Sequence, residues 1–308
     1  MLSARKLEAG SGALKKRKLD EKLVSGILFV LPALALVLVF LVLPVIMSFR
    51  YSLTNWNGVS TEYQFIGFEN FKNVIASSEF KTLFKNTFYL IILYVPVLNI
   101  LALLFAVIIY DIGKLANVYK VILFLPNIIS MVVVGFIWRT IYNPATGPLA
   151  FILDKVGLGF LIQDWIGQKQ TVMPALSVSI IWFAVGFYVL IYLGGLSTVP
   201  AELYEAADVD GISWWQRLFK ITIPLIAQSI TINIIVSTIA ILTLFDLPYV
   251  LTQGGPGYAS QTMALMSYQY AFKAMSQGKA MALAVMLTII TILFSIVELF
   301  FLRRKEDY

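Results

Sequence analysis

Long runs of apolar residues dominate this chain, and they constrain its fold more than any other feature. Several runs exceed the roughly 20 residues that a helix needs to cross a bilayer core. They are continuous rather than alternating, so they predict helices and not barrel strands. Of 308 residues, 59% are hydrophobic and 13% are charged, whereas a soluble domain carries about 25% charged residues. The sequence therefore predicts an all-α integral membrane protein.

Six transmembrane helices are expected. The predicted spans are 25–47, 87–110, 119–141, 173–196, 222–250 and 280–302. They form one transmembrane domain at 25–302, between a basic arm at 1–24 and a short tail at 303–308.

Basic residues set the expected orientation. The arm is rich in lysine and arginine, at Arg5, Lys6, Lys15, Lys16, Arg17, Lys18 and Lys22. Cytoplasmic segments of membrane proteins carry an excess of such residues. In this chain, the segments on the same side of the membrane as the arm hold more lysine and arginine than the segments on the other side. We expect both termini, and the polar insert at 197–221, to be cytoplasmic. A basic arm can bind nucleic acid, but its place beside an apolar run favours a membrane flank, so no nucleic-acid partner is expected.

Missing residue types and motifs exclude several classes of chemistry. The chain has no cysteine and no histidine, which removes disulfides, thiolate metal sites and the usual general base near neutral pH. No metal site or cofactor is expected. The pattern G-x-x-x-x-G-K-[ST], which cradles nucleotide phosphates, is also absent. We expect a protein that is not an enzyme and that draws energy from a partner.

The insert between the fourth and fifth predicted spans is the most informative polar segment. Residues 197–224 read STVPAELYEAADVDGISWWQRLFKITIP. Ser197 or Thr198 can cap a first helix, with Pro200 near its first turn. Gly211 can end that helix in the left-handed conformation, and Ser213 can cap a second helix. The pattern predicts helix, glycine turn, helix.

Charge favours a protein partner for this insert. Its first helix is acidic and carries no basic residue before Arg217. An amphipathic helix resting on lipid would be repelled by an anionic leaflet if its polar face were acidic. Docking against a soluble partner therefore accounts for the pattern better than lipid binding does.

The insert resembles a known family signature. Glu205-Ala206-Ala207, three residues, Gly211, nine residues and then 221–224 (ITIP) is similar to the EAA motif of permease subunits in binding-protein-dependent ABC importers. That family usually has leucine where this chain has Ile223. Further segments resemble its carbohydrate-uptake branch, of the maltose and glycerol-phosphate type: FIGFENF at 65–71, LPNIISMVVVGFIWRTIYNPATGPL at 125–149 and FDLPYVLTQGGPG at 245–257.

The resemblance implies a type I ABC importer permease with a cytoplasmic coupling helix between helices four and five. It gives the ATPase-docking role to Glu205, Ala206, Ala207, Asp210 and Gly211. It also implies two cytoplasmic ATP-binding subunits, a second permease that is usually homologous but non-identical, and an external solute-binding protein. The expected location is the inner membrane of a bacterial or archaeal cell. A homodimer of permeases stays open.

Candidate substrate contacts lie in the fourth and fifth spans, where the resemblance places them. Asn233 and Ser237, with Ser229, recur every fourth residue and share one helical face. Such a stripe can hydrogen-bond sugar hydroxyls or hold two helices together. Phe183 and Phe187 can stack on sugar rings or serve only in packing.

Three alternatives remain at this point. An ion-gradient-driven secondary carrier would need carboxylates in mid-span, whereas Asp246 and Glu298 lie near predicted span ends, where they can reach water. An ABC permease for a non-sugar solute is a second alternative. A membrane scaffold without transport is a third, and it leaves the EAA pattern unexplained.

Overall fold

The computed structural model describes residues 24–302. These residues form helices joined by turns, with one isolated antiparallel bridge between Thr54 and Phe65. The chain divides into two units at Tyr51 and Ser52. The predicted arm, except for Val24, and the predicted tail at 303–308 lie outside the described residues.

The described residues of the first unit, 24–51, form one helix, which ends at Ser52. Its 29 residues are enough to cross a bilayer. A π-helical turn, η1 (Leu38–Val42), leads into α2 (Leu43–Ser52), whose second residue is Pro44. Proline has no N–H to donate and its ring crowds the preceding turn, which accounts for a widened turn at this place.

The second unit holds the remaining helices of the described chain. In order, these are α3 (Glu69–Ala76), α4 (Phe80–Asp111), η2 (Gly113–Leu115), α5 (Ala116–Ile128), α6 (Met131–Ile141), α7 (Pro148–Lys155), η3 (Gly159–Leu161), α8 (Val172–Leu196), α9 (Ala201–Val209), α10 (Trp214–Arg217), η4 (Leu218–Thr222), α11 (Ile223–Leu225), α12 (Ala227–Leu242), α13 (Asp246–Thr252), α14 (Met263–Phe272) and α15 (Gln277–Leu302).

Helix α8 is the centre of this unit, because it packs against α4, α5 and α12. It is hydrophobic all round, as a helix enclosed by other helices must be. A Cβ atom at Gly186 would collide with the backbone carbonyl of Leu123, so glycine allows α5 to approach α8 closely. Small residues serve this purpose in membrane helix packing.

Four of the six predicted spans are confirmed as long apolar helices. The spans at 25–47, 87–110, 173–196 and 280–302 correspond to Val24–Ser52, α4, α8 and α15. The observed helices are longer than predicted, most of all α4, which begins at Phe80 rather than near residue 87. Six spans are reached if each of two bent helix pairs is one span.

The third predicted span, 119–141, is not one continuous helix. The chain leaves the helix at Ile129 and Ser130, and α5 and α6 meet at 97°. Pro126 in the last turn of α5 cannot donate a backbone hydrogen bond, which weakens the helix at this place. A break of this kind is tolerated in a membrane where it is buried in protein or lines a cavity.

The fifth predicted span, 222–250, is also not one continuous helix. Pro224 lies in the short α11, Ile226 has φ −98° and ψ 18°, and the segments on either side of it meet at 76°. Helix α12 then ends at Leu242, and α13 begins separately at Asp246. Residues 222–245 are mostly apolar and carry no charge, so hydrophobicity alone did not show the breaks.

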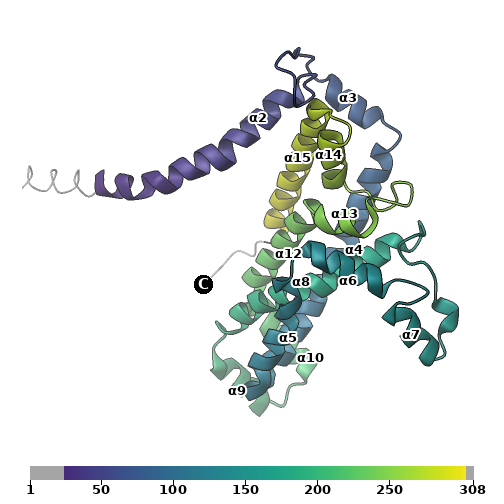
Figure 1. Ribbon diagram of the computed structural model, residues 1–308. Coiled ribbons are helices and arrows are strands. Elements are labelled where there is room, and N and C mark those ends of the chain that lie inside the picture. Colours follow the sequence, from purple (N-terminus) through teal and green to yellow (C-terminus); the bar gives the residue numbers. More distant parts are fainter. Residues whose placement is uncertain (1–23, 303–308) are drawn as a thin grey trace, which may run out of the picture. The chain divides into compact units, whose positions relative to one another are not determined.

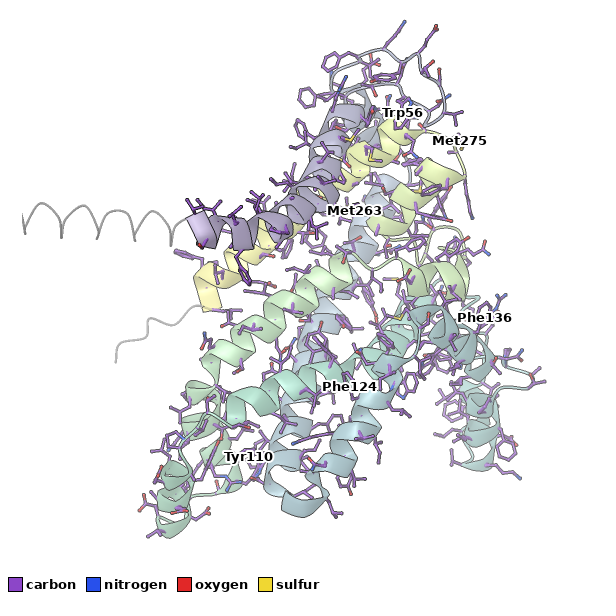
Figure 2. All side chains as sticks on the ribbon, turned by 60° about the vertical axis from the view of Figure 1, so that its left-hand side comes forward. Trp56, Tyr110, Phe124, Phe136, Met263 and Met275 are labelled. Carbon is purple, nitrogen blue, oxygen red and sulfur yellow. The ribbon has the colours of Figure 1, made fainter. Side chains whose placement is uncertain are left out.

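The second unit has two distinct ends. Helices α9 and α10 lie at one end and α3 lies at the other (Figure 1). Figure 2 shows Tyr110 near the end with α9 and α10, whereas Trp56 and Met275 lie at the opposite end. The predicted insert is therefore well separated from the loops around α3.

Candidate functional site

The insert folds as helix, glycine turn, helix, as predicted. Gly211 has φ +66° and follows α9, whose last carbonyls are satisfied by Gly211 N–H to Asp208 (3.2 Å) and Ile212 N–H to Ala207 (3.2 Å). This is the Schellman arrangement, which favours glycine in the left-handed position. Ser213 caps α10 as predicted, through a reciprocal pair of hydrogen bonds with Gln216.

The predicted cap of the first insert helix is wrong. Pro200 occupies the position before α9 and makes no side-chain cap. The hydroxyls of Ser197 and Thr198 instead donate to the carbonyls of Leu193 (2.8 Å) and Gly195 (2.8 Å), at the end of α8. Hydroxyl side chains bond backbone groups on either side of them, and here the unsatisfied carbonyls of the preceding helix are the nearer acceptors.

Helix α9 has two faces, and the EAA residues divide between them. Tyr204, Ala207 and Asp208 share one face; Ala207 is buried, and Asp208 and Tyr204 contact Arg217. Glu202, Glu205, Ala206 and Val209 share the other face and are exposed, with Val209 at 88%. Asp210 and Gly211 are exposed at the turn that follows. The outward face thus combines two carboxylates with a fully accessible valine.

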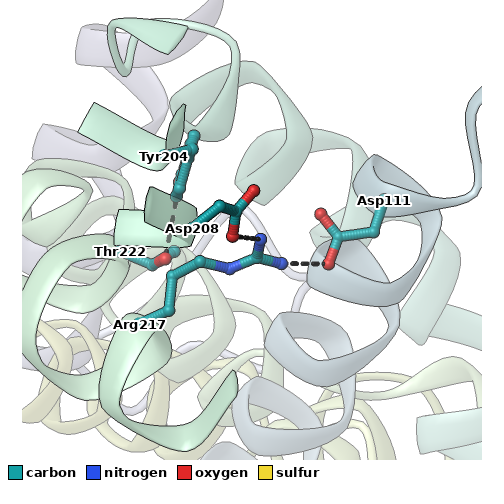
Figure 3. Close-up of polar contacts among 5 residues, drawn as sticks. All are labelled: Asp111, Tyr204, Asp208, Arg217 and Thr222. Atoms are coloured by element: carbon teal, nitrogen blue, oxygen red, sulfur yellow. Dashed lines mark hydrogen bonds and ion pairs between the residues drawn. The ribbon is translucent and has the colours of Figure 1, made fainter. Parts of the chain in front are cut away.

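Arg217 joins the inward face of α9 to the end of α4 (Figure 3). Its guanidinium donates to a carboxylate oxygen of Asp111 at 2.6 Å and lies 3.7 Å from Asp208. The same group lies 5.5 Å from the centre of the Tyr204 ring. The Tyr204 and Thr222 hydroxyls are 3.4 Å apart, and burial raises the pKa of the Tyr204 phenol, so this group stays neutral at physiological pH.

A cavity of about 320 Å³, the central cavity, lies between α4, α5, α6, α8 and α12 of the second unit. The predicted Phe183 and Phe187 both line it. The other polar or aromatic groups in its wall are Tyr94, Tyr188 and the amide of Asn127. Asn127 and Met131 flank the break between α5 and α6, so that break opens onto a cavity.

Few polar groups face this cavity, and one of them, the Asn127 amide, is available to a ligand. The phenols of Tyr94 and Tyr188 interact with each other. The Asn127 side chain has no hydrogen-bond partner among residues 24–302. An apolar wall with a few polar groups is typical of small-molecule sites.

A larger cavity of about 420 Å³ between α14 and α15 is less suited to a polar ligand. The hydroxyls in its wall already donate to backbone carbonyls, as Ser267 does to Ala280 (2.9 Å) and Thr288 does to Ala284 (2.9 Å).

Asn233 and Ser237 lie behind the central cavity rather than in its wall. Both are fully buried in the chain. The Asn99 amide on α4 donates to the Ser237 hydroxyl (3.0 Å) and accepts from Tyr192 on α8 (2.8 Å). Asn233 donates to the Tyr188 carbonyl (3.2 Å). These bonds connect α4, α8 and α12, which favours the helix-joining role over direct contact with a sugar.

Sequence reasoning missed several groups of both sites. Tyr94 and Asn127 belong to spans two and three, where only the fold brings them to the Phe183 side of α8. Arg217 had a local signal, because it is the first basic residue after an acidic helix, but its partner Asp111 is 106 positions away.

The comparisons with known proteins all point to one family. Residues 74–306 match the family described as binding-protein-dependent transport system inner membrane component. The trehalose/maltose transport system permease protein MalF of Thermococcus litoralis is 32% identical over 285 residues, which cover 92% of this chain and 95% of that protein. The diacetylchitobiose uptake system permease protein NgcF of Streptomyces coelicolor is 30% identical over 300 residues, covering 93% and 85%.

A solved structure shares the fold. It is a bacterial alginate ABC transporter in complex with an alginate pentasaccharide-bound periplasmic protein. The likeness has a TM-score of 0.79 and 24% identity, and it covers 95% of this chain and 98% of that chain. The family model covers most of the chain, and both relatives match it nearly from end to end. The chain therefore belongs to the family of inner membrane components of binding-protein-dependent transport systems, the permeases of ABC importers, which are membrane transport proteins and not enzymes.

Proposed function

We propose that this chain is one of two permease subunits of an ATP-driven importer for a carbohydrate. A second permease, homologous and non-identical, completes the pathway. Two cytoplasmic ATP-binding subunits hydrolyse ATP, and an external solute-binding protein delivers the sugar. The chain crosses the inner membrane of a bacterial or archaeal cell with both termini in the cytoplasm, as the distribution of its basic residues favours.

The outward face of α9 is the single observation that carries the proposal. An exposed valine between carboxylates at the end of a membrane bundle offers both an apolar contact and negative charge, and the charge is unsuited to an anionic leaflet. A cleft in an ATP-binding subunit that pairs these carboxylates and covers Val209 would satisfy the whole face.

Each EAA residue then has a role. Glu205 and Asp210 carry charge into the contact, and Ala206 lets the partner backbone approach. Ala207 is buried and keeps α9 close to its own bundle, while Gly211 sets the angle between the two insert helices.

The central cavity is the proposed carbohydrate pathway. Phe183 and Phe187 offer aromatic faces to a sugar ring, and Tyr94, Tyr188 and Asn127 offer hydrogen bonds to its hydroxyls. Asn233 and Ser237 hold the helices behind this wall. Its volume of about 320 Å³ is at the lower end of ligand pockets, as expected for one wall of a pathway shared with a second subunit.

The relatives support a carbohydrate as the substrate class. One relative is named for trehalose and maltose transport, another for diacetylchitobiose uptake, and the structural match transports alginate. All three are saccharides of two or more units.

Reconstitution tests the proposal. The chain is placed in proteoliposomes with its partner permease, ATP-binding subunits and binding protein, and uptake of labelled mono- and oligosaccharides is measured. We expect uptake that requires ATP and every partner. Uptake driven by a proton or sodium gradient without the ATP-binding subunits would overturn the proposal in favour of a secondary carrier.

A further inference from the structure

Asp111 occupies a place where a carboxylate is unfavourable. It is the last residue of α4, a 32-residue helix with no basic residue in its last turn. The carboxyl end of a helix carries partial negative charge, which repels an acidic side chain. Because the last turn of its own helix has no basic residue to offset this charge, a cation from elsewhere in the chain is favourable beside Asp111.

Arg217 supplies that cation from the insert. Its 2.6 Å contact with Asp111 crosses from the end of α10 to the end of α4, and its 3.7 Å contact with Asp208 reaches back to α9. The rings of Tyr110 and Tyr204 lie 6.1 Å apart and make a second contact between α4 and α9. Both halves of the insert are therefore tied to the same helix end (Figure 3).

Helix α4 leads from this point to the central cavity without a break. It carries Tyr94, which lines the cavity, and Asn99, which bonds Ser237 and Tyr192 on the neighbouring helices. The covalent route from the insert, by contrast, passes through η4 and the 76° bend at Ile226 before it reaches α12. The ion pair thus offers the insert an unbroken helical connection to the cavity wall.

We propose that Arg217 is a positioning residue that couples the insert to α4 through Asp111. When the ATP-binding subunits displace the outward face of α9, the Arg217–Asp111 pair moves the end of α4 and with it the wall of the carbohydrate pathway. The proposal rests on the proposed function, since it needs a partner that moves the insert.

The exposure of the pair indicates what its loss changes. The side chains of Arg217 and Asp111 are 20% and 39% exposed to solvent, and ion pairs this accessible contribute little to the stability of the fold. Removing the pair should leave the fold and the outward face of α9 intact. The effect should then fall on the link between ATP hydrolysis and transport.

The test uses the complete reconstituted complex and measures uptake and ATP hydrolysis in parallel. Asp111→Asn and Arg217→Gln are compared with the double variant, with the conservative Asp111→Glu, and with Lys220→Gln. Lys220 is an exposed cation near Arg217 in the chain that makes no ion pair within residues 24–302, so it controls for lost charge.

We expect both single variants to copurify with the ATP-binding subunits as wild type does. Sugar transported per ATP should fall about threefold or more in each. The double variant should be no worse than either single variant, because both remove the same contact. Asp111→Glu and Lys220→Gln should stay near wild type.

Three results would overturn the inference: unchanged transport per ATP in both single variants, additive losses in the double variant, or loss of copurification, which would make Arg217 a docking residue. These differ from a failure of the proposed function, in which wild type itself shows no ATP-dependent uptake.

Discussion

The insert and the central cavity are built in opposite ways. The insert is one continuous, exposed and acidic segment whose shape is set by caps and a glycine turn within residues 200–222. The cavity is assembled from five helices, its lining residues run from Tyr94 to Leu244, and its wall is mostly apolar. The first arrangement suits a protein surface, and the second suits a small ligand. Changes in the cavity should therefore leave the docking of the ATP-binding subunits on the insert intact.

The largest effect is expected from reversing a charge on the outward face of α9. Glu205→Lys should reduce ATP-dependent uptake at least tenfold, because like charges that face each other across an interface cost several kcal/mol. Copurification with the ATP-binding subunits measures the loss of docking. Glu62→Lys, an exposed acid outside the insert, is the matched control. Normal uptake with Glu205→Lys would remove the docking role from this face.

A change in backbone geometry at Gly211 is expected to come next. No atom lies within 4 Å of the position a Cβ would take there, so only the φ of +66° opposes a side chain. A β-branched residue in that conformation costs about 1–3 kcal/mol. Gly211→Val should weaken ATPase binding and uptake by about tenfold, whereas Gly211→Asn, which tolerates the left-handed region, should lose much less. Equal losses would show that side-chain bulk, rather than the turn, matters.

Much of the insert could be predicted because its signals are local. Gly211 and Ser213 act within a few residues of their own positions, and both predictions are confirmed. The cap at Ser197 or Thr198 failed because two sets of backbone groups compete for those hydroxyls, and only the fold decides between them. The contact between Arg217 and Asp111 depends on how α4 and α10 meet, which no local pattern contains.

The cavity could be predicted only in part. Aromatic residues in span four indicated Phe183 and Phe187, but Tyr94 and Asn127 come from helices whose neighbours were unknown. The breaks at Ile129 and Ile226 also lie within long, mostly apolar segments. An apolar run specifies that a segment enters the membrane, whereas its bends depend on proline and on what satisfies the freed carbonyls.

Shortening an aromatic side chain in the cavity should have an intermediate effect. Phe187→Ala and Phe183→Ala remove a stacking face worth about 0.5–1.5 kcal/mol, so uptake should fall several-fold. Copurification with the ATP-binding subunits should not change, which separates this region from the insert. Phe151→Ala, an exposed ring on α7, is the control. If the cavity variants transport normally, the pathway does not use these rings.

Removing a buried hydroxyl behind the cavity should have the smallest effect. Ser237→Ala deletes the acceptor of the Asn99 amide, and such bonds between membrane helices contribute about 0.6 kcal/mol on average. Thermal unfolding in detergent should shift down slightly, with the substrate concentration for half-maximal uptake unchanged. A several-fold rise in that concentration would instead make Ser237 a direct contact.

The most direct test of the account asks where Val209 lies and what covers it. The chain has no cysteine, so Val209→Cys creates a unique thiol on an 88% exposed position of the outward face. A membrane-impermeant maleimide should label it only from the cytoplasmic side, and assembly with the ATP-binding subunits should protect it. Labelling from the external side, or labelling that assembly leaves unchanged, would contradict the account.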